Sequence, residues 1–222
     1  MAQSRPEALP PETRPVGQLV AETLRLYGHI FWRALPLGLS VAVTDQLVRE
    51  VSLEAKILAL IACSPVFSFA YAAASALVAE RKPPAAIWVR TVVLGSLAFL
   101  PAAVVLPWFA LLAFGWLAFV GLVVPVVMVE QAGWRSALPR AVRLARADYV
   151  HALGSLATLA ILFFLTRLML ALLLRDASDQ AERIAIFAAD LVLAPVLFLG
   201  SALLYFDQVA RLESPRRKRK ES

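Results

Sequence analysis

The chain has 222 residues, of which 60% are hydrophobic and 17% are charged, and its formal net charge is +6. A soluble globular domain is about half apolar. This composition, with a mean hydropathy of +0.73, excludes most soluble enzyme classes and indicates a membrane protein. We therefore ask first whether the basic residues set the orientation of the chain in the membrane, and only then whether they could bind nucleic acid.

Residues 1–15 form a proline-rich lead that carries mixed charges and lacks the apolar core of a signal peptide. We expect this lead to be disordered. Residues 16–213 are predicted to form a single transmembrane domain, and residues 214–222 a basic cytoplasmic tail. The domain is predicted to be an all-α bundle of about six transmembrane helices with two amphipathic surface helices.

The first amphipathic pattern covers residues 16–31, where apolar side chains recur at helical spacing opposite a polar face. It predicts a helix on the inner membrane surface that leads into a first span over residues 30–48. Arg33 and Asp45 leave only eleven uncharged residues between them in this span. It is therefore the weakest of the six, and a chain with five spans is the main alternative.

The clearest membrane signal is a window of 39 residues, 91–129, without a single charged side chain. At 1.5 Å per residue, one helix of that length would reach about 58 Å, roughly twice the thickness of the hydrocarbon core. The window must therefore fold back on itself. A turn at residues 106–109 predicts one span over 87–106 and another over 109–130.

Three further apolar stretches predict spans over residues 57–79, 150–174 and 184–206. If both termini are inside, 16 of the 22 basic residues fall on the inner side, 4 lie in outer loops and 2 lie within spans. Short cytoplasmic loops carry an excess of Lys and Arg. We therefore expect a multi-pass protein of the bacterial inner membrane with both termini in the cytoplasm.

A second amphipathic pattern covers residues 134–149 and carries Arg140, Arg143 and Arg146 on one flank. These arginines predict either a phosphate or lipid-headgroup site or simply a surface helix attracted to anionic lipid. A faint internal repeat relates residues 16–79 to residues 134–206. Because both copies would cross the membrane in the same direction, the repeat predicts a parallel duplication of the kind found in some transporters.

Two ionisable residues stand out inside the predicted spans, where an unpaired charge is costly. Arg167 lies eight residues before Arg175, and Asp190 lies seven residues after Arg183. Their depths are then about 12 and 10.5 Å at 1.5 Å per residue, so a helical hairpin would bring them level. We predict that Arg167 and Asp190 form an ion pair, which either locks two helices together or takes part in proton or substrate movement.

Glu130 and Asp207 each mark the inner end of a span. They either end their helices and pair with a nearby arginine, or belong to a larger polar cluster on the cytoplasmic side. The members of this predicted cluster are Glu130, Arg140, Arg143, Arg146, Asp207 and Arg211.

The chain offers little for catalysis or cofactor binding. Cys63 is the only cysteine and the two histidines are far apart in the sequence, so a cysteine-based zinc site is excluded. No P-loop, nucleophile elbow or metalloprotease motif is found. We expect no catalytic, cofactor-binding or metal-binding residues.

Short stretches of the sequence carry a resemblance to a known family: Pro125-Val-Val-Met-Val-Glu130, Ala137-Leu-Pro-Arg-Ala-Val-Arg-Leu-Ala-Arg146 and Leu204-Tyr-Phe-Asp207. In these residues the chain resembles an uncharacterised bacterial family of six-helix membrane proteins, which is similar to the membrane domain fused to some glycerophosphoryl diester phosphodiesterases. The resemblance covers most of residues 16–213, with a departure at Val209, where the family often has Arg. It implies a six-helix membrane fold and no phosphodiesterase activity, because that chemistry belongs to a separate soluble domain.

Three functions remain after these exclusions. The favoured one is a non-catalytic membrane protein that organises or assists membrane partners; the alternatives are a transporter of a small molecule or lipid with a midplane site, and an intramembrane enzyme. The expected partners are the bilayer, with anionic lipids at the cytoplasmic face, and a membrane-protein partner or a second copy of the chain, but no nucleic acid. A polar cavity near the midplane would favour the transporter, whereas a fully packed bundle would favour the first function.

Overall fold

The computed structural model describes the backbone of residues 15–221 and the side chains of residues 15–213. All regular structure in this part of the chain is helical, which confirms the predicted all-α fold. The predicted lead lies outside the described residues as far as residue 14. The predicted tail begins inside the last helix, whose backbone remains helical as far as Glu221.

The helices follow one another with short connections. In chain order they are α1 (Val16–His29), α2 (Phe31–Ala34), the 3-10 turn η2 (Leu35–Gly38), α3 (Leu39–Val48), α4 (Leu53–Ala79), α5 (Ala85–Val105), α6 (Ala110–Val120), α7 (Val123–Glu130), α8 (Trp134–Ala145), α9 (Tyr149–Leu173) and α10 (Asp179–Glu221).

Five helical stretches among the described residues are long and apolar enough to cross a membrane. They are α4, α5, α6 together with α7, α9, and α10 as far as Glu213. The chain is therefore a membrane protein with an all-α bundle. The long charge-free window folds back as predicted, since α5 ends at Val105 and α6 begins at Ala110.

The first predicted span, residues 30–48, does not form one long helix. It is divided into α2, the turn η2 and the ten-residue α3. Pro36 lies in η2 and has no backbone N–H to continue an α-helical ladder, so the break occurs there. Five stretches rather than six consequently pass the test of length and apolarity.

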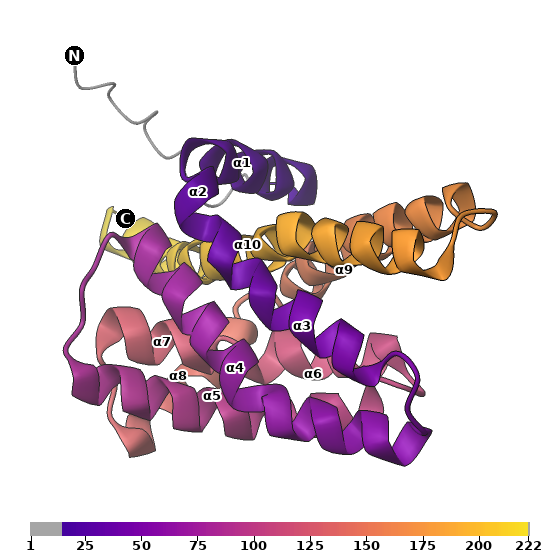
Figure 1. Ribbon diagram of the computed structural model, residues 1–222. Coiled ribbons are helices and arrows are strands. Elements are labelled where there is room, and N and C mark those ends of the chain that lie inside the picture. The colour runs from indigo at the N-terminus through magenta and orange to yellow at the C-terminus, as the bar shows by residue number, and fades with distance from the viewer. Residues whose placement is uncertain (1–14, 222) are drawn as a thin grey trace.

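The helices alternate between two ends of the bundle, as Figure 1 shows. The connections from α3 to α4 and from α9 to α10 lie at one end, which we call the far end. The connection from α4 to α5 and the C-terminus lie at the other, which we call the tail end. Arg49 pairs with Glu182 and Glu50 with Arg183, so the end of α3 is held beside the start of α10 at the far end.

The core is centred on α7, in which six of eight residues are buried. The flanking helices approach closely where small residues allow it. A Cβ atom on Gly38 would lie 2.1 Å from the carbonyl oxygen of Leu191, so only glycine lets η2 rest directly on α10. The hydroxyl of Tyr71 donates to the carbonyl oxygen of Ser201 at 3.2 Å and joins α4 to α10.

The helix α1 packs against α9 and α10 through one face. Leu19, Thr23 and Tyr27 of α1 are buried. The Tyr27 hydroxyl donates to the carbonyl oxygen of Val192 at 2.7 Å, and burial raises the pKa of this phenol, so it stays a neutral donor. This contact fixes the end of α1 against the middle of α10.

Candidate functional site

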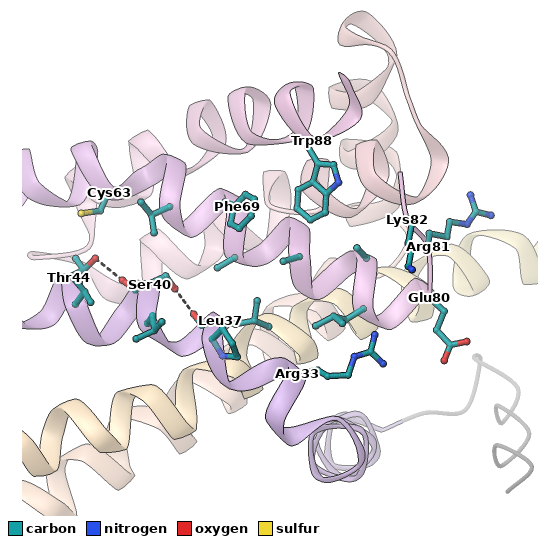
Figure 2. Close-up of a pocket in the computed structure, with 18 of the residues that line it drawn as sticks. Arg33, Leu37, Ser40, Thr44, Cys63, Phe69, Glu80, Arg81, Lys82 and Trp88 are labelled. Atoms are coloured by element: carbon teal, nitrogen blue, oxygen red, sulfur yellow. Dashed lines mark hydrogen bonds between the residues drawn. The ribbon is translucent and has the colours of Figure 1, made fainter. Parts of the chain in front are cut away.

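A groove of about 910 Å³ opens between α3 and α4. This volume lies at the upper end of the range for small-ligand pockets, about 300–1,000 Å³. Figure 2 shows η2 and α3 along one side of the groove, α4 along the other and Trp88 of α5 above it. It is therefore a candidate site for a bound molecule.

The body of the groove is apolar and faces outward from the bundle. Side chains that line it remain substantially exposed, among them Val43 at 48%, Leu47 at 59% and Phe69 at 54%. The groove is therefore open at the side of the bundle rather than enclosed in the core.

The few polar groups along the groove are already satisfied within their own helix. The Ser40 hydroxyl donates to the carbonyl oxygen of Leu37 and the Thr44 hydroxyl to that of Ser40, both at 2.7 Å (Figure 2). Such hydroxyls present mainly their carbon atoms to a ligand. The middle of the groove is thus suited to hydrocarbon rather than to a polar solute.

The tail end of the groove carries charge. Arg33, Glu80, Arg81 and Lys82 line it there, and Figure 2 shows them at the opposite end from Cys63 and Thr44. Arg81 also donates to the carbonyl oxygen of Val129 at 2.8 Å, which fixes its position beside the end of α7. With three basic groups and one acidic group, this mouth has a net positive charge.

The connection after α4 brings these charged residues together. Glu80 adopts the left-handed conformation, with φ of 52°, and so ends α4. The helix cannot continue past a residue in this conformation, so Arg81 and Lys82 follow in a short non-helical connection to α5. From the sequence, Arg81 and Lys82 are only two of the basic residues predicted on the inner side, because nothing in the sequence shows that η2 brings Arg33 next to them.

The predicted contact between Arg167 and Asp190 is present. Nε of Arg167 lies 3.3 Å from Oδ1 of Asp190, and the Asp190 side chain is fully buried. A second carboxylate, not included in the prediction, also binds this arginine: Nη2 of Arg167 donates to Oδ1 of Asp45 at 2.7 Å. Arg167 also lies over the ring of Phe163, 5.6 Å from its centroid.

Asp45, Arg167 and Asp190, which we call the triad, join α3, α9 and α10. Sequence reasoning placed Arg167 and Asp190 at one depth because their helices form a hairpin. Asp45 could not be found in that way, because its distance from Arg167 depends on how α3 packs on α10. The only signal for it was an acidic residue inside a weak span.

The predicted cytoplasmic-side cluster is divided into two separate groups. In the first, Nε of Arg140 donates to both carboxylate oxygens of Glu130 at 3.0 Å. The Tyr205 hydroxyl donates to the same carboxylate at 2.9 Å. The hydrogen bond to Glu130 raises the pKa of the Arg140 guanidinium, so this arginine remains charged.

The second group contains two residues that the prediction did not include, Asp148 and His151. Arg211 donates to Asp207 at 2.7 Å and to Asp148 at 2.8 Å. Nε2 of His151 lies 2.9 Å from Asp207, whose side chain is fully buried. Asp148 also caps α9 by accepting a hydrogen bond from the backbone N–H of His151. This group fastens the start of α9 to the tail end of α10.

Arg143 and Arg146 do not join either group. Arg146 lies over the ring of Phe119, 5.9 Å from its centroid, and within the side chains of residues 15–213 neither arginine forms an ion pair with a carboxylate. Both are exposed, Arg143 on α8 and Arg146 directly after it. The structure therefore does not join all six predicted residues in one cluster.

The described residues contain no group of three or more His, Cys, Asp or Glu side chains arranged to hold a metal ion. The polar groups instead form ion pairs between helices. No protein-family model matches the chain, and comparisons with curated proteins and with solved structures find no relative.

Proposed function

We propose that this chain is a non-catalytic protein of the bacterial inner membrane that binds an anionic phospholipid in the groove between α3 and α4. In this proposal the divided segment α2–η2–α3 crosses the bilayer together with the five longer stretches, so both termini and the tail end of the bundle face the cytoplasm, where 16 of 22 basic residues are predicted to lie. The lipid enters sideways from the inner leaflet. Membership of the six-helix family that the sequence resembles is part of the same proposal.

The observation that supports this function best is the pairing of an apolar body with a basic mouth in one groove. Acyl chains match the exposed Val43, Leu47 and Phe69 side chains, which offer carbon atoms along the groove. A phosphate group matches Arg33, Arg81 and Lys82 at the tail end. One amphiphilic molecule satisfies both parts, whereas a water-soluble metabolite satisfies only the mouth.

The depth of the mouth also favours a phospholipid. Trp32, next to Arg33, is 80% exposed, and exposed tryptophans gather at the level of the lipid headgroups. The basic residues of the mouth therefore lie at the height of inner-leaflet phosphates. Attraction to anionic lipid is about 1 kcal/mol for each basic residue near the surface.

A lipid transporter is the second candidate, and the length of the groove favours it. The groove runs from Arg81 at the tail end to Leu47, two residues before Arg49 at the far end. A path of that length gives a lipid a route across most of the bundle. Binding and transport share the groove and differ in whether the lipid leaves at the far end.

The direct test is to remove the charge of the mouth. The purified triple variant Arg33→Gln, Arg81→Gln, Lys82→Gln is compared with the wild type in nanodiscs that contain phosphatidylglycerol or phosphatidylcholine, and retained lipid is counted by native mass spectrometry. At about 1 kcal/mol per charge, we expect the triple variant to bind phosphatidylglycerol up to about a hundredfold more weakly. Binding of phosphatidylcholine is expected to change little.

A matched control removes the same number of charges elsewhere on the proposed cytoplasmic side. The triple variant Arg25→Gln, Arg135→Gln, Arg143→Gln changes exposed residues of α1 and α8 that do not line the groove. Equal loss of phosphatidylglycerol in both triple variants would refute a specific site. Movement of a fluorescent phospholipid between leaflets of proteoliposomes, if it depends on the same mouth residues, would favour transport over binding alone.

A further inference from the structure

We propose that the triad of Asp45, Arg167 and Asp190 is a proton-binding site in which Asp190 holds the proton. The site is separate from the lipid groove and does not depend on what the groove binds. It rests on three observations: the number of charges in the triad, the burial of Asp190 and the unequal distances from Arg167 to the two carboxyl groups.

The charges of the triad do not balance without a proton. Two carboxyl groups face one guanidinium, which is always positive. The other charged groups nearby, towards the far end, are already paired with each other: Arg49 of α3 with Glu182 of α10, and Arg183 of α10 with Glu50. If both aspartates were ionised, the triad would carry a net negative charge inside the bundle.

Burial makes that net charge costly at Asp190. Its side chain is fully buried, and neither of its carboxyl oxygens accepts a hydrogen bond from any described residue. A buried carboxylate without donors is strongly disfavoured, and taking up a proton removes its charge. A single proton leaves the triad neutral, with one carboxylate and one guanidinium.

The geometry indicates which aspartate holds the proton. Asp45 accepts a hydrogen bond of 2.7 Å from Arg167 and its side chain is 22% exposed. Asp190 lies 3.3 Å from Arg167 without a hydrogen bond and is not exposed at all. Arg167 therefore neutralises Asp45, and the proton neutralises Asp190.

Proton release would change how α3 is held. An ionised Asp190 competes with Asp45 for the guanidinium, and Asp45 is the residue through which α3 is tied to α9. With Asp190 protonated, the folded protein binds one proton more at this site than the unfolded chain, because an exposed aspartate in the unfolded chain is ionised at neutral pH. By linkage, stability is greatest at low pH and falls as the pH rises through the range in which Asp190 loses its proton.

Two isosteric variants test the assignment. Asp190→Asn keeps a neutral side chain of the same shape, so its unfolding temperature in nanodiscs should match the low-pH value of the wild type and stay flat from about pH 5 to about pH 8. Asp45→Asn removes the carboxylate that Arg167 needs and should lower the unfolding temperature at every pH. Equal losses in the two variants, or a wild type that becomes more stable as the pH rises, would overturn the proposal.

Infrared spectroscopy tests the protonation state of Asp190 directly. A protonated carboxyl group in an apolar site has its own C=O stretching band, which we expect in the wild-type protein at neutral pH and not in Asp190→Asn. In Asp45→Asn, Asp190 is the only carboxyl group left to balance the charge of Arg167, so we expect the band to weaken there as well. Absence of the band from the wild type would overturn the proposal. Stability that depends on the concentration of Na⁺ or K⁺ at fixed pH would also overturn it, because an alkali cation would then balance the charge.

Discussion

Two pairs of antiparallel helices in this bundle meet in different ways. In one pair, α9 is 25 residues long, unbroken, and packs along α10. The other pair consists of α4 and the divided segment before it. This segment is broken at η2, and its longest part, α3, has only ten residues. The first pair is closed and the second leaves the groove of about 910 Å³.

The difference arises from where the shorter helix is attached. Gly38 lets η2 rest on the backbone of α10 at Leu191, and Asp45 ties α3 to Arg167 of α9. Both attachments hold η2 and α3 against α10, while α3 also contacts α4 along the floor of the groove. Two specific contacts on the opposite side of the groove therefore fix one of its walls.

The largest effect is expected from Arg167→Ala, which removes the ion-pair partner of Asp45. Breaking a buried pair costs about 3–5 kcal/mol. We expect the lower end of this range, because the Arg167 side chain is 21% exposed. The measurement is the free energy of unfolding in mixed micelles. Arg175→Ala, at a residue that is 74% exposed beside Asp176, should cost less than about 1 kcal/mol.

Double variants of Arg167 show which of the two aspartates depends on it more. Because Asp45 is the ionised partner, the double variant Arg167→Ala, Asp45→Ala should recover more stability than Arg167→Ala, Asp190→Ala. The reverse order would mean that the closed pair α9–α10, and not the attachment of α3, depends on this arginine.

The next effect tests the other attachment. Gly38→Ala places a methyl group against the backbone of Leu191, which cannot move aside as a flexible side chain can. We expect a loss of about 2 kcal/mol of stability, within the range for overpacking. Gly28→Ala, at a position with no atom within 4 Å of the added group, is the control. Similar unfolding temperatures for the two variants would contradict a tight contact between η2 and α10.

A smaller effect is expected where the two helix pairs meet each other. Tyr71→Phe removes only the hydrogen bond from α4 to Ser201 of α10. A single hydrogen bond contributes about 1 kcal/mol, so the midpoint of chemical unfolding should fall slightly. Tyr149→Phe removes a hydrogen bond to Gly115 at a more exposed position and should cost less. A larger loss for Tyr149→Phe would mean that the hydrogen bond between α6 and α9 contributes more to stability than the one between α4 and α10.

The smallest change in stability, with a clear change in binding, is expected from Ala73→Phe. Ala73 lines the groove and is half-buried, so the added ring should occupy space that lipid takes in the proposed function. Retained phosphatidylglycerol, counted by native mass spectrometry, should fall while the unfolding temperature stays near that of the wild type. Ala86→Phe, on an exposed position of α5, should leave both unchanged. Full retention in Ala73→Phe would argue against lipid in this part of the groove.

Local physical rules were enough to predict much of the bundle from sequence. A charge-free window too long for one helix must fold back, and α5 and α6 do so at the predicted turn. Arg167 and Asp190 could be paired because the short connection between their helices fixes their relative depth. Both predictions depend only on residues close together in the chain or on one hairpin.

The remaining features depend on contacts between distant segments. The packing of η2 on α10 joins Gly38 to Leu191, and no periodicity in either segment encodes it. The same packing brings Asp45 to Arg167 and Arg33 to the mouth of the groove. At the tail end, His151 and Asp148 meet Asp207 and Arg211 for a similar reason. Pro36 was visible in the sequence, but prolines are common in membrane helices.

The order of elements agrees with the predicted internal repeat without testing it. A short helix, an outgoing helix and a long returning helix occur in α1, α3 and α4 and again in α8, α9 and α10. The hydrogen bond between Tyr71 and Ser201 joins the first predicted copy, residues 16–79, to the second, residues 134–206. The duplication itself stays a prediction.

Cys63 is a natural site for attaching a spectroscopic label. It is the only thiol in the chain, it is half-buried, and it lines the groove at the end away from the charged mouth (Figure 2). A single maleimide-linked fluorophore or spin label can therefore be attached there without engineering any other cysteine. The native sequence thus offers one chemically unique position from which the filling and emptying of the groove can be followed in real time.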